Sequence, residues 1–136
     1  MLRPITEFSL EEHAGPYETW PGKSALYADT VPTDCTVPGY VIEGQYSWDG
    51  GFLLITSYDC PSEESQEFVL LDSSFQFLSK KSLGVMHGSY LLMSHQVVSD
   101  DGIELLFAGG ERWRLQVRPG KWPACRRLRL QRQSSV

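Results

Sequence analysis

From residue 39 onward, apolar and polar residues alternate along most of the chain, with the period of two that is typical of half-buried β-strands. In the stretch 40–48, aromatic or aliphatic side chains stand at positions 40, 42, 46 and 48, and polar side chains stand at 43, 45 and 47. The run Asp49-Gly50-Gly51 follows directly, and glycine supplies the positive φ that a tight hairpin turn needs. The pattern therefore predicts a hairpin whose strands cover residues 40–48 and 52–58.

The same alternation, interrupted by short runs of Asp, Ser, Gly and Pro, predicts six more strands. They cover residues 67–71, 75–78, 90–98, 103–107, 112–118 and 124–131. The segments 39–84 and 89–131 then each hold four strands in a similar order, which suggests two copies of one four-stranded meander. Such meanders can form a barrel, a face-to-face sandwich or two blade-like units, and the alternation alone does not choose among them.

The first 38 residues are rich in proline and glycine. Besides Pro4, this segment contains Pro16, Pro21, Pro32 and Pro38. Because proline cannot donate a ladder hydrogen bond, we predict an irregular N-terminal arm over residues 1–38, with room for short strands at 5–8 and 25–28. Ser9 and Glu12 have the spacing of a capping box, which favours at most one short helical turn.

These patterns predict a single all-β domain of 136 residues, built as an antiparallel meander of about eight to ten strands. A hydrophobic content of 41% with 21% charged residues lies far from the composition of disordered chains. No apolar run approaches the roughly 18 residues that a membrane-spanning helix needs, and the first residues lack the apolar stretch of a secretory signal. We therefore expect a cytoplasmic protein that has no membrane partner.

The common catalytic and cofactor motifs are missing from the sequence. There is no glycine-rich phosphate loop and no Gly-x-Ser-x-Gly nucleophile turn. The three cysteines have no Cys-x-x-Cys spacing, which disfavours a compact zinc site. Reduced thiols are the simplest expectation for them, while a disulfide between the loops of Cys35 and Cys60 stays open. We expect no enzyme activity, no catalytic residue, no metal and no cofactor.

Charge is distributed unevenly along the chain. Residues 1–72 carry 2 basic and 13 acidic side chains, a balance of −11, whereas residues 73–136 carry 10 basic and 4 acidic ones, a balance of +6. Attraction between the two halves inside one compact fold is the first expectation. The alternative is a charged surface that binds a partner.

Arginines gather on the last two predicted strands. Alternation places Arg112, Arg114 and Arg118 on one side of their strand, and Arg127 and Arg129 of the next strand can fall on the same side. The predicted partner-binding residues are these five together with two near the intervening turn: Arg112, Arg114, Arg118, Lys121, Trp122, Arg127 and Arg129. The planar guanidinium suits carboxylate and phosphate groups.

Three functions fit this sequence. The first is a non-catalytic protein-interaction domain, such as an inhibitor or immunity-type protein, which binds an acidic surface of a toxin or an enzyme. The second is a small-molecule-binding β-barrel or small enzyme with an interior pocket near His95, beside Tyr46 or Trp48. The third is a binder of single-stranded nucleic acid through the arginines, which the net charge of −5 disfavours.

Overall fold

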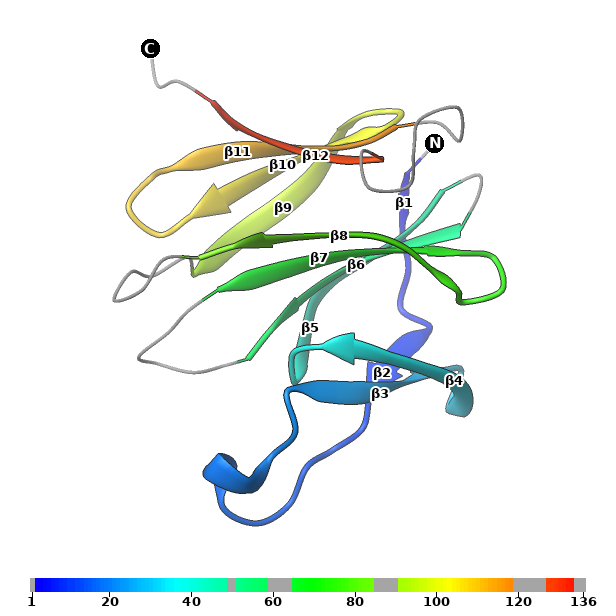
Figure 1. Cartoon of the computed structure of the whole chain (residues 1–136). Coiled ribbons are helices and arrows are strands. Elements are labelled where there is room, and N and C mark those ends of the chain that lie inside the picture. Colours follow the sequence, from blue (N-terminus) through cyan, green and yellow to red (C-terminus); the bar gives the residue numbers. More distant parts are fainter. Residues whose placement is uncertain (1, 49–50, 59–64, 85–90, 119–126, 134–136) are drawn as a thin grey trace.

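The computed structural model describes residues 2–48, 51–58, 65–84, 91–118 and 127–133. Within this part of the chain, twelve strands and one 3-10 turn form three antiparallel sheets (Figure 1). The prediction of an all-β antiparallel fold is confirmed, with more strands than expected. The described strands are layered as separate sheets and do not close into a barrel.

A five-stranded sheet, in the order β1-β5-β6-β7-β8, forms the middle layer. Its strands are β1 (Arg3–Pro4), β5 (Val41–Trp48), β6 (Gly51–Ser57), β7 (Gln66–Asp72) and β8 (Phe77–Leu83). Strands β5 to β8 follow one another as a four-stranded meander within the predicted segment 39–84. Strand β8 starts later than predicted because Phe75 has a φ of 63° and packs its ring against the core beside the Asp72 turn.

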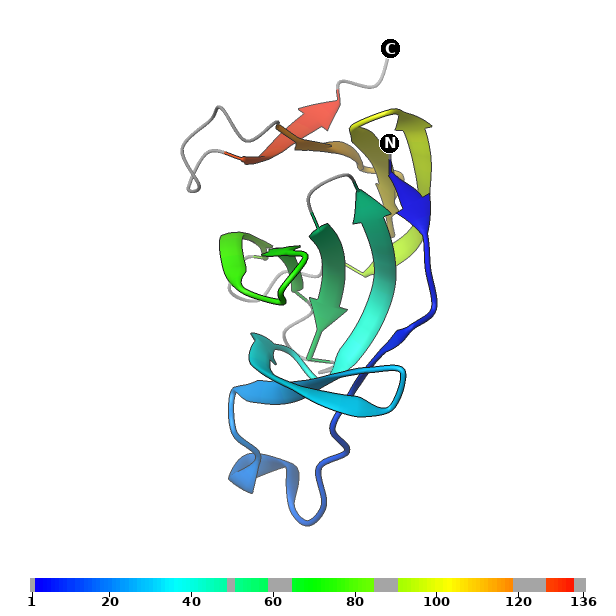
Figure 2. The same cartoon turned by 90° about the vertical axis from the view of Figure 1, so that its right-hand side faces the viewer.

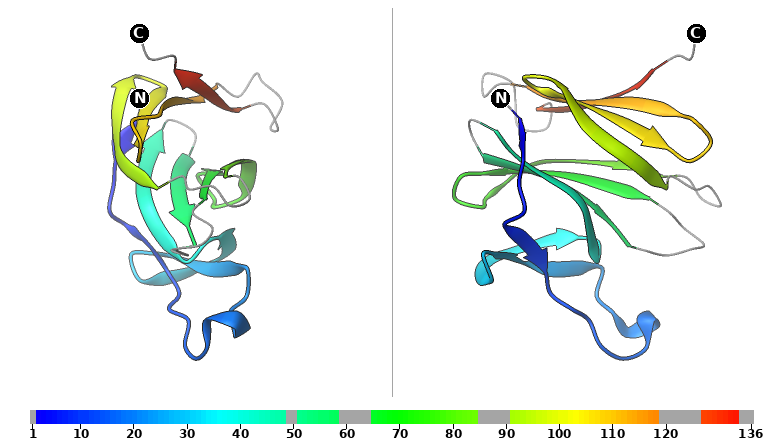
Figure 3. Two further views of the ribbon diagram at one scale, coloured as in Figure 1. Left: turned by 90° about the vertical axis from the view of Figure 1, so that its left-hand side faces the viewer. Right: turned by 180° about the vertical axis from the view of Figure 1, so that it is seen from behind.

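The other two sheets cover the two faces of the middle layer (Figures 1 and 3). One has the order β12-β11-β10-β9 and consists of β9 (Leu92–Ser99), β10 (Gly102–Phe107), β11 (Arg112–Val117) and β12 (Leu128–Gln133). The other has the order β2-β3-β4 and consists of β2 (Phe8–Leu10), β3 (Lys23–Ala28) and β4 (Val31–Pro38). The 3-10 turn, Tyr17–Thr19, lies between β2 and β3.

The inner strands β6 and β7 are buried on both faces. Leu53 and Phe68 belong to the core shared with the four-stranded sheet, whereas Leu54 and Val69 belong to the core shared with the three-stranded sheet. All four side chains have an exposed fraction of 0%. Strands covered on both faces contain apolar runs instead of strict alternation, which explains why residues 52–55 read as apolar without interruption.

The two open sides of the sandwich made by the four- and five-stranded sheets differ. On one side, β1 pairs with β5, and the N–H of Leu2 donates to the carbonyl of Asp100 at 2.9 Å, so the N-terminal segment bridges the two sheets. On the other side, β8 and β12 are the outer strands of their sheets (Figure 2). On this second side, the outer strands β8 and β12 contact each other, and neither pairs with a further strand in the described part of the chain.

The prediction of an irregular arm over residues 1–38 is wrong for half of that segment, because strands β1 to β4 contain 19 of its 38 residues. The central strand of the three-stranded sheet, β3, contains no proline and includes the predicted stretch 25–28. Pro32 and Pro38 both lie on β4, an edge strand whose outer side needs no donors. Proline is therefore compatible with this sheet, because both prolines lie on its edge strand.

The helical turn expected after Ser9 does not form there. Ser9 pairs with Tyr27 in the ladder between β2 and β3, and Glu11 continues that ladder by donating its N–H to the carbonyl of Ala25 at 3.0 Å. Pairing with β3 satisfies this backbone and buries Phe8, which a single exposed helical turn would not do.

Candidate functional site

The exposed face of the four-stranded sheet carries a group of arginines. Strand register places Arg112 opposite Gln133, Arg114 opposite Gln131, and Arg129 opposite Gln116. Their neighbours on the other side of the strands, such as Leu115 and Leu128, are buried in the core. Arg112, Arg114 and Arg129 are exposed, and we call these three residues the arginine face.

Internal charge pairing does not account for the arginine face. Within the described part of the chain, Arg112, Arg114 and Arg129 make no hydrogen bond or ion pair, although Glu104 lies across the strand pair from Arg114. Arg132, an arginine of the same sheet, pairs with Glu111 at 3.6 Å. The three-stranded sheet with its connecting segments, residues 8–38, carries five acidic and one basic side chain and lies on the far side of the middle sheet (Figure 1). The expected attraction between the two halves is therefore not made through direct contacts of these arginines.

A basic groove runs along the open side of the sandwich, between β8 and the pair β11–β12. It has a volume of about 380 Å³. Its apolar lining consists of Leu83, Trp113, Leu128 and Leu130. Its basic lining consists of Lys81, Arg118 and Arg129. Arg129 belongs both to this groove and to the arginine face, so the two form one continuous basic surface.

The remaining predicted site residues are placed differently. Arg127 does not join the arginine face: its guanidinium carbon lies 5.0 Å from the centre of the Trp48 ring, which packs against the core between the two sheets. Lys121 and Trp122 lie outside the described residues. Sequence reasoning missed Lys81 and Trp113. The strand that contains Lys81 was expected to end at residue 78, and from the strand over 112–118 the predicted site took only the arginines.

His95 is a bridge between two sheets. Its Nε2 lies 3.0 Å from the carbonyl oxygen of Glu43, and because a carbonyl only accepts, Nε2 carries the proton of that hydrogen bond. In the neutral ring, Nδ1 then accepts from the Tyr46 hydroxyl. Gly44 makes room for the imidazole, since a Cβ there would stand 2.9 Å from His95 Cε1.

The hydroxyl of Tyr46 lies inside this bridge, and burial raises its pKa to about 12. Both imidazole nitrogens and the phenol are therefore engaged with one another or with backbone. His95 lines neither the basic groove nor the larger groove described next. This geometry explains His95 as a structural group and provides no support for the pocket that the sequence suggested around it.

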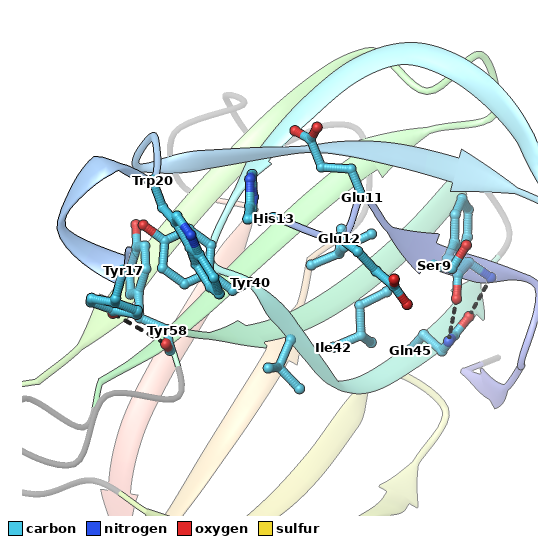
Figure 4. Close-up of a pocket in the computed structure, with 13 residues that line it drawn as sticks. Ser9, Glu11, Glu12, His13, Tyr17, Trp20, Tyr40, Ile42, Gln45 and Tyr58 are labelled. Atoms are coloured by element: carbon cyan, nitrogen blue, oxygen red, sulfur yellow. Dashed lines mark hydrogen bonds between the residues drawn. The ribbon is translucent and has the colours of Figure 1, made fainter. Parts of the chain in front are cut away.

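A second groove, of about 690 Å³, lies on the three-stranded sheet side (Figure 4). We call it the aromatic groove. One end is formed by the rings of Tyr17, Trp20, Tyr40 and Tyr58, and the other end by Ser9, Ile42 and Gln45. Leu10 also lines the groove. Tyr40 is the centre of the aromatic end: its ring stands nearly perpendicular to those of Tyr17, Trp20 and Tyr58, at centroid distances of 5.6, 5.1 and 5.2 Å.

Backbone carbonyls hold these rings in place. The Tyr40 hydroxyl donates to Pro21 at 2.7 Å, and the Tyr58 hydroxyl donates to Gly22 at 3.2 Å. Burial, followed by the nearby charges of Glu67 and Tyr40, raises the pKa of Tyr58, so this hydroxyl keeps its proton for the hydrogen bond. Sequence reasoning missed the aromatic groove because its walls come from segments up to 50 residues apart, from Phe8 to Tyr58.

The described residues contain no group of three or more His, Cys, Asp and Glu side chains arranged to hold a metal ion. Cys35 is a free, half-buried thiol on β4, and burial raises its pKa. Cys60, its proposed disulfide partner, lies outside the described residues. No helix in the described part of the chain is long and apolar enough to cross a membrane.

Comparison with known proteins leaves the class of this chain open: no protein-family model, no curated protein and no solved structure matches it.

Proposed function

We propose that this chain is a non-catalytic protein-interaction domain that binds an acidic segment of a protein partner along its basic surface. The observation that carries the proposal is the arginine face, whose three guanidinium groups are exposed and have no partner in the described part of the chain. Surface arginines that are free of internal partners can pair with incoming carboxylates without first breaking an existing ion pair.

The basic groove adds apolar contact area to this charge. Leu83, Leu130 and Trp113 can bury apolar side chains of a partner, while Lys81 and Arg129 can face its carboxylates. Apolar anchors surrounded by a polar rim are the usual organisation of a protein–protein interface, and aromatic residues and arginine are enriched there. An inhibitor or immunity-type protein that captures an acidic toxin or enzyme would use a surface of this kind.

Affinity capture from the source cell with charge-reversed variants tests the proposal. The variant Arg114→Glu with Arg129→Glu changes the arginine face and the groove. The control variant Arg3→Glu with Lys23→Glu makes the same total charge change on the other two sheets. We expect the wild type and the control variant to retain a protein partner that the Arg114/Arg129 variant loses.

A partner captured equally by both variants would refute the assignment of this surface. Single-stranded nucleic acid is the competing ligand, and its binding should fall steeply with added salt. The test uses a fluorescent oligonucleotide at low salt. If the wild type binds it, the Arg114/Arg129 variant does not, and no protein is captured, then nucleic acid and not a protein is the ligand of this surface.

A further inference from the structure

The aromatic groove is a preorganised site whose walls are fixed by hydrogen bonds. At one end, the side-chain amide of Gln45 accepts from Phe8 N–H at 2.8 Å and donates to Phe8 C=O at 3.1 Å, so it pairs with β2 as a neighbouring strand would. At the other end, Tyr40 and Trp20 are fixed by hydrogen bonds to the carbonyls of Pro21 and Gly15. A ligand would therefore enter a site that loses little conformational freedom on binding.

Beyond Phe8, strand β2 presents an unpaired backbone edge to this groove. Glu7, Ser9 and Glu11 direct their backbone groups toward the ladder with β3. Because these groups alternate in direction along an antiparallel strand, the N–H and C=O of Leu10 point to the opposite side, where Gln45 already pairs with Phe8. Leu10 lines the groove, so an extended peptide could continue there the pairing that Gln45 begins.

The charge of the groove is negative. Glu11 is occupied, since its Oε1 accepts from the N–H of Ala25 at 2.8 Å. Glu12 is exposed and makes no hydrogen bond or ion pair in the described part of the chain, and Figure 4 shows its carboxylate above Ile42 and Gln45. Residues 1–48 carry seven acidic and two basic side chains, a balance of −5, so the surrounding field has the same sign.

The histidine of the groove is held in place by a hydrogen bond and by contacts with two aromatic rings. Ser24 Oγ donates its only proton to the carbonyl of Gly39 at 2.6 Å, so His13 Nε2, at 2.8 Å from that oxygen, is the donor. The His13 ring also packs 5.2 Å from Trp20 and 5.1 Å from Tyr40. The aromatic faces beside it are themselves weakly attractive to cations.

We propose that the aromatic groove binds an extended basic segment of a protein partner. The segment pairs with the backbone of Leu10, a lysine or arginine side chain pairs with Glu12, and neighbouring side chains lie on Ile42 and on the aromatic end. A volume of about 690 Å³ accommodates several residues of an extended chain, which is more than a single small cation needs. This site is opposite in charge to the arginine face and does not depend on the function proposed above.

Peptide titration of the full chain tests the proposal. The probe is a fluorescent, end-blocked six-residue peptide of alternating lysine and valine, followed by anisotropy, and the matching glutamate–valine peptide is the ligand control. Glu12→Gln is expected to weaken binding of the basic peptide about 3–5-fold, as for an exposed ion pair. Glu18→Gln removes the same charge from the neighbouring 3-10 turn, outside the groove lining, and should leave binding unchanged.

A second arm tests the strand pairing without altering the protein. The same peptide with N-methylated valines cannot donate to the carbonyl of Leu10, and it should bind at least about 5-fold more weakly, as expected for a lost hydrogen bond. Arg114→Glu with Arg129→Glu should leave this peptide binding intact, so failure here and failure of the proposed function are distinguishable.

Several results would overturn the proposal. Equal effects of Glu12→Gln and Glu18→Gln would indicate general electrostatic attraction instead of a site. Equal binding of the N-methylated peptide would refute strand pairing. Complete competition by tetramethylammonium would indicate a small-cation site. Concentration-dependent self-association that Glu12→Gln abolishes, measured by analytical ultracentrifugation, would make a second copy of this chain the occupant.

Discussion

The buried hydroxyl of Tyr46 should make the stability of the fold depend on pH in alkaline solution. Its side chain has an exposed fraction of 1%, and burial raises its pKa from 10.0 to about 12. Because the folded-state pKa is raised above the unfolded value, this contribution to stability is fully present below pH 10 and is lost as the pH rises toward 12. At pH 11, one unit above the unfolded pKa, the loss is about 1.4 kcal/mol.

The substitution Tyr46→Phe separates this effect from the hydrogen bond that the hydroxyl makes to His95. At pH 8 the variant should be less stable than the wild type by about 1 kcal/mol, because it lacks the hydrogen bond and leaves His95 Nδ1 without its donor. At pH 11 the wild type has lost about 1.4 kcal/mol through Tyr46 and the variant has not. The difference in unfolding free energy should therefore vanish or change sign near pH 11.

Urea denaturation between pH 8 and pH 11, followed by tryptophan fluorescence, measures this difference. Tyr17→Phe makes the same chemical change at a ring that is 43% exposed, and it controls for the general effect of alkali on the fold. A difference between the wild type and Tyr46→Phe that stays constant from pH 8 to pH 11 would refute the reasoning.

Two further predictions concern packing, and both are measured as unfolding free energies by urea denaturation. Gly44→Ala should destabilise the fold by about 1–3 kcal/mol, because its Cβ would stand 2.9 Å from His95 Cε1, and combining it with His95→Ala should cost less than the sum of the two single changes. Strict additivity would argue against this contact. Leu70→Ala, in the fully buried core, should lower the unfolding free energy by about 2–5 kcal/mol. Phe77→Ala, at a ring that is 53% exposed, should cost less than about 1 kcal/mol, and similar losses at the two positions would contradict the assignment of the core.

Local pattern predicted most strands after residue 39. The alternation over 112–118 correctly separated the exposed Arg112 and Arg114 from the buried Leu115, because side chains on a strand alternate between its faces whatever the sheet packs against. The same logic identified two consecutive four-stranded meanders. The prediction failed where the proline content of residues 1–38 was taken to exclude a sheet. Prolines on the edge strand β4 are compatible with a sheet.

The arrangement of sheets was decided by tertiary structure. Sequence alone left barrel, sandwich and blade-like units open, because each presents the same alternation to a core. Only the fold shows that β6 and β7 are covered on both faces, that Arg127 stacks on Trp48, and that His95 meets Tyr46. The Tyr46–His95 contact joins residues 49 positions apart.

The same limit applies to the candidate sites. The sequence by itself determined which residues could be exposed on a strand, so it identified the arginine face in part. The two grooves depend on which strand edges and loops come together. The basic groove brings Lys81 near Arg129, and the aromatic groove brings together Leu10 and Tyr40. Alternation is a property of neighbouring residues, whereas a groove results from packing between segments distant in sequence, so only the tertiary structure could locate them.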